Sequence, residues 1–290
     1  MLTNEQIIEK VSNALVEAGS TFREDKKSAY RRAIETETNP QAKWVIETIL
    51  KNAEAAQRNQ SPLCDDSGIP HIVLEIGENV AVTGAALDAI REGIKQGLRK
   101  LPGRPMGIMG SDCERIDQSG GLNPDSAGVE PAPFLIRKCK EDIVRLHIMM
   151  FGGGPAIRGK TYRVFHKHST DTVFNEIIEW SKEAVSQLGC SPCTLAVGIG
   201  RSHFEAAAMM VEALTEGTYE KQSEMEKRIT DAVNCADIGA LGLHGKTSVL
   251  ATFLKVGPQR ASGVRIVCMR PCCCFEPRIA TIDLWNDDAS

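Results

Sequence analysis

"GCSPCTLAVGIGRSHFEAAAMMVEAL" (189–214) holds a loop with two cysteines, a strand, a turn and a helix in direct succession. The apolar run 194–200 is typical of a buried strand, and the Ala- and Met-rich run that follows has the composition of a helix. Cys190 and Cys193 precede the strand, whereas a thioredoxin-like dithiol opens a helix after a strand. The stretch therefore predicts a mixed fold with a cysteine loop at the end of a strand.

The rest of the chain shows the same mixture of helices and strands. The first 60 residues predict three helices, and Thr3 with Gln6 forms a capping box at the start of the first. Further elements are expected as strands at 71–77, 142–150 and 263–269, and as helices at 81–101, 171–188 and 219–236. No repeat or linker marks a boundary, so we expect one α+β domain over 1–290, with a helical part (1–60) and a larger mixed part (61–290).

One long segment is expected to lack regular structure. Residues 102–133 are rich in Gly and Pro and show no apolar periodicity. Loops of that length are usually functional or disordered. We therefore expect this segment to contribute to a binding site.

Composition and charge narrow the class of protein. The 290-residue chain is 42% hydrophobic and 25% charged, with a net charge of −4 at pH 7. Scattered charges of this balance argue against nucleic acid or an anionic membrane as the partner. The first ten residues are polar, and no apolar run approaches the roughly 18 residues of a membrane span. We expect a cytoplasmic protein whose ten cysteines stay reduced.

Three widely separated loops carry the cysteines of interest, at 64, at 190–193 and at 272–274. Cys190 and Cys193 with two cysteines of the triplet can bind zinc, although three adjacent residues point their thiolates in different directions. Soft thiolates from distant loops also suit an iron–sulfur cluster, and three protein ligands leave one iron of a four-iron cluster open to a substrate oxygen.

Two further motifs carry candidate chemistry. The triple glycine at 152–154 can expose backbone N–H groups to an anion, but it lacks the spacing of nucleotide-binding loops. Two interpretations of the triple glycine stay open: it binds a small carboxylate, or it forms a tight turn without a ligand. Cys64 is followed by Asp65 and Asp66, and two neighbouring anions disfavour a nucleophilic thiolate but allow a metal-bound one.

Four segments together match the motifs of one known enzyme family. They are "PLCDDSG" (62–68), "GCSPCTLAVGIG" (189–200), "GALGLHGKTSVLA" (239–251) and "CFEPR" (274–278). They look like the family motifs P-x-C-Q-D-T-G, C-P-P-x-x-x-G-x-G-I, G-x-x-G-L-x-G and C-W-x-x-R. Over nearly its whole length the chain resembles the α subunit, or N-terminal domain, of the class I iron–sulfur hydro-lyases, which include class I fumarate hydratase and L(+)-tartrate dehydratase.

The resemblance implies a 4Fe-4S cluster in the 61–290 part of the chain. The family's ligands fall on Cys64, Cys190 and one cysteine of the triplet. Cys274 is the best match within the triplet, because the residues after it then follow the family's C-W-x-x-R pattern. Cys272 and Cys273 stay open as alternatives.

The resemblance also implies a reaction, the reversible addition or removal of water on a small hydroxy-dicarboxylic acid of the fumarate/malate or tartrate type. Asp66 matches the family's catalytic aspartate and is the predicted general acid, and Asp65 stands near the substrate where the family has Gln. For Arg104 and Lys160, carboxylate binding and a solvated loop charge are both open. The predicted substrate contacts are Asp65, Arg104, Gly152, Gly153, Gly154 and Lys160.

The family's enzymes need a second part, a β subunit or C-terminal domain, that supplies further substrate-binding groups. We therefore expect a β subunit as the partner of this chain, in an oligomeric enzyme. The alternative from another class is a zinc-stabilised binding or assembly protein without catalysis.

Overall fold

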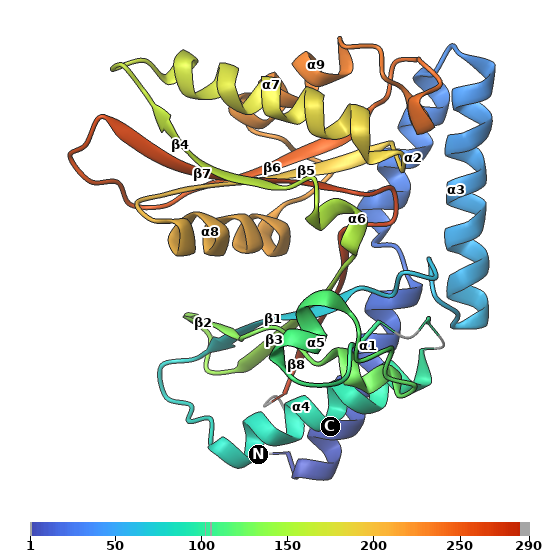
Figure 1. Ribbon diagram of the computed structural model, residues 1–290, viewed down its shortest axis with the longest axis vertical. Helices are drawn as coiled ribbons and strands as arrows, with labels where there is room; N and C mark the ends of the chain where they lie inside the picture. Colours follow the sequence, from blue (N-terminus) through green and yellow to red (C-terminus); the bar gives the residue numbers. More distant parts are fainter. Residues whose placement is uncertain (1, 102, 105, 285–290) are drawn as a thin grey trace. The chain divides into compact units, whose positions relative to one another are not determined.

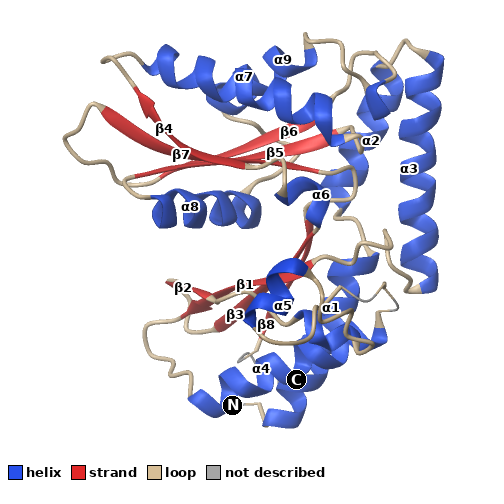
Figure 2. Cartoon of the chain, viewed as in Figure 1, coloured by secondary structure: helices blue, strands red, loops and turns tan. Residues whose placement is uncertain are grey.

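The computed structural model describes residues 2–101, 103–104 and 106–284. The chain divides into two compact units (Figures 1 and 2). Unit 1 takes its described residues from 1–21, 53–151 and 278–290, and unit 2 from 22–52 and 152–277. The prediction of a single domain over 1–290 stays a prediction, because compactness alone does not show which part folds independently.

Unit 1 is a four-stranded sheet covered on one face by two helices (Figure 1). The strand order is β2-β1-β3-β8, with β1 (Ile69–Ile76) parallel to β2 (Leu135–Lys138) and antiparallel to β3 (Val144–Phe151), which pairs with β8 (Arg278–Asp283). Helices α1 (Asn4–Ser20) and α4 (Gly84–Lys100) pack on this sheet and on each other. Gly97 permits their close contact, since a Cβ there would lie 2.9 Å from the Ser12 carbonyl oxygen.

The long segment 102–133 is less irregular than its composition predicts. It contains α5 (Asp112–Asp117) and the 3₁₀ turn η1 (Ser126–Val129). The side chains of Ser111 and Glu114 form a capping box at α5. No residue of α5 is buried, so apolar periodicity gives no signal for this helix.

Unit 2 is a three-layer arrangement around a second four-stranded sheet (Figure 1). The order is β4-β7-β5-β6, formed by β4 (Lys160–Phe165), β7 (Val264–Cys272), β5 (Cys193–Gly200) and β6 (Val249–Val256). Helices α7 (Thr170–Leu188) and α9 (Glu224–Asn234) cover one face, and α8 (His203–Glu216) covers the other. Every residue of β5 is buried, because both faces of the central strand are covered.

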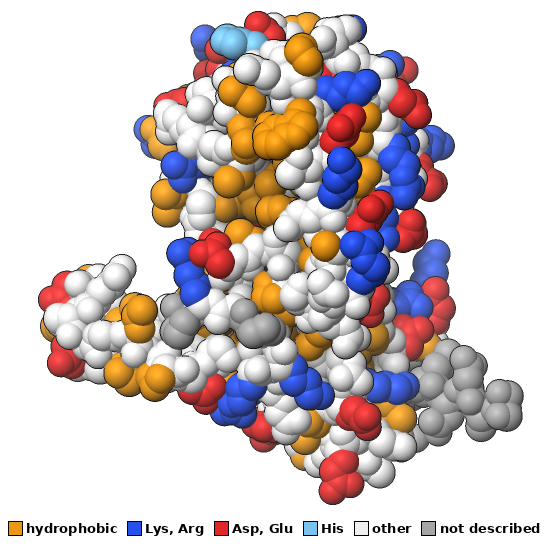
Figure 3. Space-filling view, turned by 90° about the vertical axis from the view of Figure 1, so that its right-hand side faces the viewer, with side chains coloured by type: hydrophobic (Ala, Val, Ile, Leu, Met, Phe, Trp, Pro, Cys, Tyr) orange, Lys and Arg blue, Asp and Glu red, His pale blue; other side chains and the backbone are white. Residues whose placement is uncertain are grey.

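The remaining elements of unit 2 lie near the cysteine loops or on the surface. They are α2 (Glu24–Thr36), the first part of α3 (Pro40–Asn59), the short α6 (Gly153–Ala156) and η2 (Ala240–Gly242). Figure 3 shows hydrophobic side chains gathered on the face that includes α3. Trp44 of α3 is 66% exposed and lines a pocket of about 340 Å³ with Pro40, Gln41 and Leu243.

The predicted α+β class is confirmed, and so are the three N-terminal helices. The strands β2, β4, β6 and β8 are found in addition to those predicted. Across the part of the chain that the structure describes, no helix has the length and apolar character that crossing a membrane requires.

Candidate functional site

Two cysteine loops of unit 2 meet through their backbones. Helix α7 ends at Leu188, and Gly189 follows it with φ 75°, a left-handed conformation that turns the chain toward Cys190. Strand β7 ends at Cys272, and two residues later the amide of Cys274 donates to the carbonyl of Cys190 at 2.8 Å. Residues far apart in the sequence are thus held side by side.

The side chains of these two cysteines interact as well. The thiol of Cys274 donates a hydrogen bond to the sulfur of Cys190, and this bond lowers the pKa of Cys190 to about 6, against the effect of burial and with help from the charge of Arg158. The same bond raises the pKa of Cys274, as do a hydrogen bond with Cys273 and burial. The pair therefore combines an exposed cysteine, Cys190, with a buried one, Cys274.

The other cysteines of these loops have different surroundings. Cys193 and Cys272 are completely buried in β5 and β7, and burial raises the pKa of both thiols. Cys273 is half-buried beside Cys274. Cys274 of the triplet is hydrogen-bonded to Cys190, and metal binding by any of the three stays a prediction.

Side chains of helix α2 hydrogen-bond to the turn that contains Cys274, and the sequence analysis did not predict these contacts. The buried hydroxyl of Tyr30 donates to the carbonyl of Cys274 at 2.6 Å. The ammonium of Lys26, also buried, donates to the carbonyl of Glu276 at 2.7 Å and lies 4.2 Å from the centre of the Phe22 ring. Burial lowers the pKa of Lys26 to about 8, against the opposing charge interactions with the cysteine triplet and with Glu276.

A buried ion pair joins the same turn to the triple glycine. Arg270 and Glu276 are 3.0 Å apart, with 6% and 0% of their surfaces exposed. The amide of Gly152 donates to the Glu276 carboxylate, and the carbonyl of Gly152 accepts from Arg270 at 3.1 Å. The first glycine of the motif is therefore bound within the protein, and Gly153 and Gly154 begin α6.

Arg158 is a further residue that sequence reasoning missed. Its guanidinium donates to the carbonyl of Gly154 at 3.1 Å and to the carbonyl of Gln187 at 2.5 Å. It thus links the glycine turn to the end of α7, just before Cys190. Its position four residues after the triple glycine was the available signal.

Unit 1 contributes the turn at residues 64–68. Asp65 organises this turn, because its carboxylate accepts the amide of Asp66 at 2.9 Å and lies 3.6 Å from the guanidinium of Arg104. The amide of Arg104 also donates to the Asp65 carbonyl at 3.3 Å. The structure thus brings together Cys64, Asp65, Asp66 and Arg104, four of the predicted site residues.

Arg278 anchors the same turn from β8. It is 2% exposed, and its guanidinium donates to the carbonyl of Asp66 at 2.7 Å. Gly68 has φ 84°, and a Cβ there would lie 2.7 Å from Arg278 Nη2 and from the Phe151 backbone. The glycine of the 62–68 motif is therefore required by both conformation and space.

The predicted residues are shared between the two units. Cys64, Asp65, Asp66 and Arg104 belong to unit 1, and Cys190, Cys274, the triple glycine and Lys160 belong to unit 2. Lys160 opens β4, with its ammonium 4.4 Å from the Trp180 ring centre. Among the described residues, no three His, Cys, Asp or Glu side chains form a group that could hold a metal ion.

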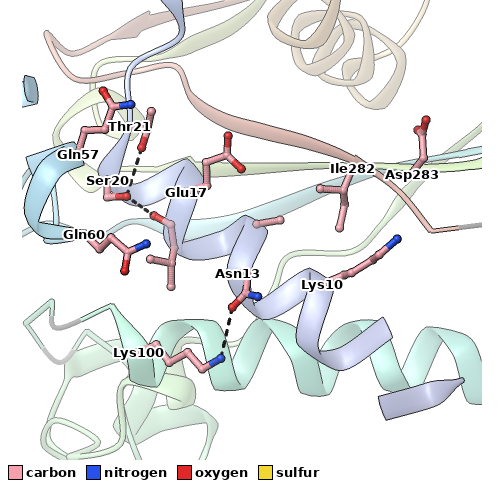
Figure 4. Close-up of a pocket in the computed structure, with 12 residues that line it drawn as sticks. Lys10, Asn13, Glu17, Ser20, Thr21, Gln57, Gln60, Lys100, Ile282 and Asp283 are labelled. Carbon is pink, nitrogen blue, oxygen red and sulfur yellow. Dashed lines mark hydrogen bonds between the residues drawn. The ribbon is translucent and has the colours of Figure 1, made fainter. Parts of the chain in front are cut away.

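A groove of about 1110 Å³ in unit 1 contains none of these residues. Figure 4 shows its lining side chains, which come mainly from α1 and the end of α3. Ser20 donates to the carbonyl of Val16 at 2.7 Å, and Lys100 donates to Asn13 at 3.5 Å. The first of these bonds lies within α1, and the second joins α4 to α1.

Comparison with known proteins gives one family and a consistent set of relatives. The family model described as "Fumarate hydratase (Fumerase)" matches residues 8–283. "Putative L(+)-tartrate dehydratase subunit alpha" of Methanocaldococcus jannaschii is 27% identical over 277 residues, covering 89% of this chain and 94% of that protein. "L(+)-tartrate dehydratase subunit alpha" of Escherichia coli K12 is 20% identical over 272 residues, covering 92% and 88%.

Proposed function

The chain belongs to the fumarate hydratase (Fumerase) family, and we propose that it is the α subunit of an iron–sulfur hydro-lyase that adds or removes water on a small hydroxy-dicarboxylic acid. The family match and the names of the relatives support the reaction and the substrate class. The structural observation that carries the proposal is the contact between Cys190 and Cys274 across two loops of unit 2.

The contact between Cys190 and Cys274 supports binding of a 4Fe-4S cluster by thiolates, although the described residues show no complete group of three ligands. A cysteine binds metal as the thiolate, and Cys190 reaches that form readily because Cys274 donates to its sulfur. We assign Cys190 and Cys274 as two ligands and Cys64, by its place in the motif, as the third. When bound, the cluster supplies an open iron that acts as a Lewis acid toward the substrate's hydroxyl and carboxylate. We place the enzyme in the cytoplasm, where thiols stay reduced.

We assign Asp66 as the general acid. Its backbone is fixed on both sides, by the Asp65 carboxylate at the amide and by Arg278 at the carbonyl. A fixed turn holds the carboxyl group in one place, and this positioning is what proton transfer to a leaving hydroxyl requires. In the hydration direction the same carboxylate accepts the proton from the water.

Carboxylate recognition is assigned to both units. Arg104 offers a planar guanidinium that suits a carboxylate, and its ion pair with Asp65 holds it at the turn next to the acid. The amide of Gly152 donates to Glu276, so Gly152 shapes the glycine turn. In unit 2, the candidates for carboxylate binding are the amides of Gly153 and Gly154 and the ammonium of Lys160. The substrate is of the fumarate/malate or tartrate type.

The partner in this proposal is a β subunit. The relatives are named as α subunits, which supports a second chain in the active enzyme. We expect the purified chain alone to have little hydro-lyase activity and the reconstituted α–β enzyme to turn over fumarate, malate or tartrate. An ultraviolet assay on these acids, with and without the β subunit under anaerobic conditions, tests this. Full turnover by the single chain would contradict the subunit assignment.

A further inference from the structure

A cavity of about 430 Å³ in unit 2 contains none of the residues assigned to the proposed reaction. It lies where β5 and β6 end and where α7, α9 and β7 begin (Figure 1). The cysteine loops are at the other ends of the same elements, since β5 begins at Cys193, β7 ends at Cys272 and α7 ends two residues before Cys190. Roughly 23 Å of extended strand separates Arg265, which lines the cavity, from Cys272. The cavity is therefore a separate site.

The lining of this cavity is mainly apolar. Val173 and Phe174 of α7 and Ile199 of β5 are buried and form its inner wall. Met225 and Val256 line it as well, and both are exposed. Cavities of this size bind small molecules through apolar contacts, with a few polar groups that fix the orientation of the ligand. The lining therefore suits a ligand with an apolar body and does not suit a short, polar dicarboxylate.

Arg265 places a cation on the apolar side of the sheet. In the register of β4 and β7 it pairs with Val164, and paired residues point to the same face. Val267, two residues further along β7, points to that face too, and both valines belong to the core that α7 covers. An apolar residue would continue this pattern. The half-buried guanidinium of Arg265 instead gives an apolar cavity one positive charge.

One nitrogen of this arginine stabilises the neighbouring loop. Nη1 donates to the carbonyls of Val264 at 2.9 Å, Ser262 at 3.1 Å and Arg260 at 3.5 Å. Within the part of the chain that the structure describes, Arg265 forms no ion pair with a carboxylate, and neither Nε nor Nη2 has a hydrogen-bond acceptor. These two nitrogens are the donors that a guanidinium uses for a bidentate contact with a carboxylate.

The turn before α7 holds the mouth of the cavity in one conformation. Nε2 of His166 donates to the carbonyl of Ser262 at 2.8 Å, and Nδ1 accepts the amide of His168 at 3.0 Å. Lys167 and His168 have φ values of 49° and 56°, in the left-handed region that non-glycine residues rarely adopt. Strained backbone of this kind persists where surrounding contacts hold it, and it is concentrated at functional sites. The turn thus supports a preformed binding site.

We propose that this cavity binds a small carboxylic acid with an aromatic or branched apolar body. The apolar body lies against Phe174 and Ile199, and the carboxylate pairs with the guanidinium of Arg265. The charge of the ligand complements the one cation in the lining that has no carboxylate partner among the described residues. The inference does not depend on the iron–sulfur cluster, because none of the proposed ligands lines the cavity.

The test uses 3-phenylpropionate as the probe and 3-phenylpropionamide as its uncharged analogue. Each is titrated into the full chain and followed by ligand-observed NMR, which measures weak binding. We expect saturable binding of the acid with a Kd of about 1 mM or below. Arg265→Gln should weaken binding of the acid at least about tenfold and leave binding of the amide unchanged, because it removes a charge-assisted contact and keeps the apolar wall.

Arg260→Gln is the matched control for the charge. Arg260 lies on the same loop, is exposed and does not line the cavity, so this variant should bind the acid as the natural chain does. If Arg265→Gln fails to fold, the preference of the natural chain for the acid over the amide takes its place as the measure of charge. Equal affinity for the acid in Arg265→Gln, or equal affinity of the natural chain for acid and amide, overturns the inference.

Val256→Trp tests the cavity without changing its charge. Val256 is exposed at the end of β6, so a larger side chain there should be tolerated and should fill the mouth. Binding of both probes should fall, whereas Ile136→Trp, at an exposed strand position in unit 1, should have no effect. The inference is wrong if the natural chain shows no saturable binding, if Val256→Trp binds undiminished, or if equimolar malate displaces the acid.

Discussion

Asp65 and Asp66 are adjacent carboxylates with different surroundings. The Asp65 carboxylate accepts a hydrogen bond from the amide of Asp66 and pairs with Arg104, so it stabilises the turn. Asp66 is held through its backbone carbonyl, which accepts a hydrogen bond from Arg278. We expect Asp66→Asn to retain the cluster but to lower kcat by about 10²–10⁴, the usual effect of losing a general acid. Asp65→Asn should change KM or substrate preference more than kcat. Steady-state kinetics of the α–β enzyme measure both.

The reverse pattern would change the assignment. If Asp66→Asn turns over normally and Asp65→Asn is inactive, the motif around Cys64 has been aligned one residue out of place. Asp65 would then be the acid.

Tyr30 allows a second test at the scale of single residues. Tyr30→Phe removes the hydrogen bond to the Cys274 carbonyl and leaves that buried oxygen without it, which should lower the free energy of unfolding by about 1–3 kcal/mol. Tyr219→Phe is a matched control, because Tyr219 is also buried and its hydroxyl bonds Thr194 at 2.6 Å. Urea unfolding should show similar losses in both variants. Iron incorporation should slow in Tyr30→Phe alone, and equal incorporation would contradict a specific role at the turn.

At the scale of elements, the sheet of unit 1 carries a buried histidine. His147 on β3 lies 2.9 Å from the Thr281 hydroxyl on β8 and 3.4 Å from Glu75 on β1. Burial lowers its pKa, against the charge and hydrogen bond of Glu75 and with help from Arg137 and Arg145. The folded protein therefore holds the proton less tightly than the unfolded chain, whose histidine titrates near about 6.5.

This shift gives a pH dependence with a defined sign. A lowered histidine pKa favours the fold above about pH 6.5 and costs stability as the pH falls below it. Chemical unfolding at several pH values between about 7 and 5 should show a steeper loss of stability in the natural chain than in His147→Gln. Parallel curves for the two proteins would show that His147 does not titrate differently on folding.

The elements found from sequence are those with strong apolar patterns. The strand expected at 142–150 is β3, whose residues are nearly all buried. Strand β4 was missed because five of its six residues are exposed, so it lacks a hydrophobic signal. Helix α2 was found, but its charged sequence "EDKKSAYRR" (24–32) reads as a surface helix and conceals the buried Lys26 and Tyr30. Burial of such residues depends on tertiary partners that local sequence does not specify.

At the scale of the whole molecule, the predicted site residues come from segments distributed along the chain. The 62–68 turn belongs to unit 1, the 189–193 loop to unit 2, and the 274–278 motif crosses from unit 2 to unit 1 between Pro277 and Arg278. The motifs indicated which residues matter, through resemblance to a family. The contact of Cys190 with Cys274 and the support by α2 required the structure, because they join residues far apart in the sequence.

The central claim is that Cys64, Cys190 and Cys274 hold one iron–sulfur cluster. The most direct measurement is the iron and sulfide content of anaerobically reconstituted chains, comparing the natural protein with Ser substitutions at these positions and with Cys193→Ser as the control. We expect about four irons and four sulfides per chain in the natural protein and in Cys193→Ser, and loss of the cluster in the other three variants. One zinc per natural chain, or a full cluster in Cys190→Ser or Cys274→Ser, would contradict the account.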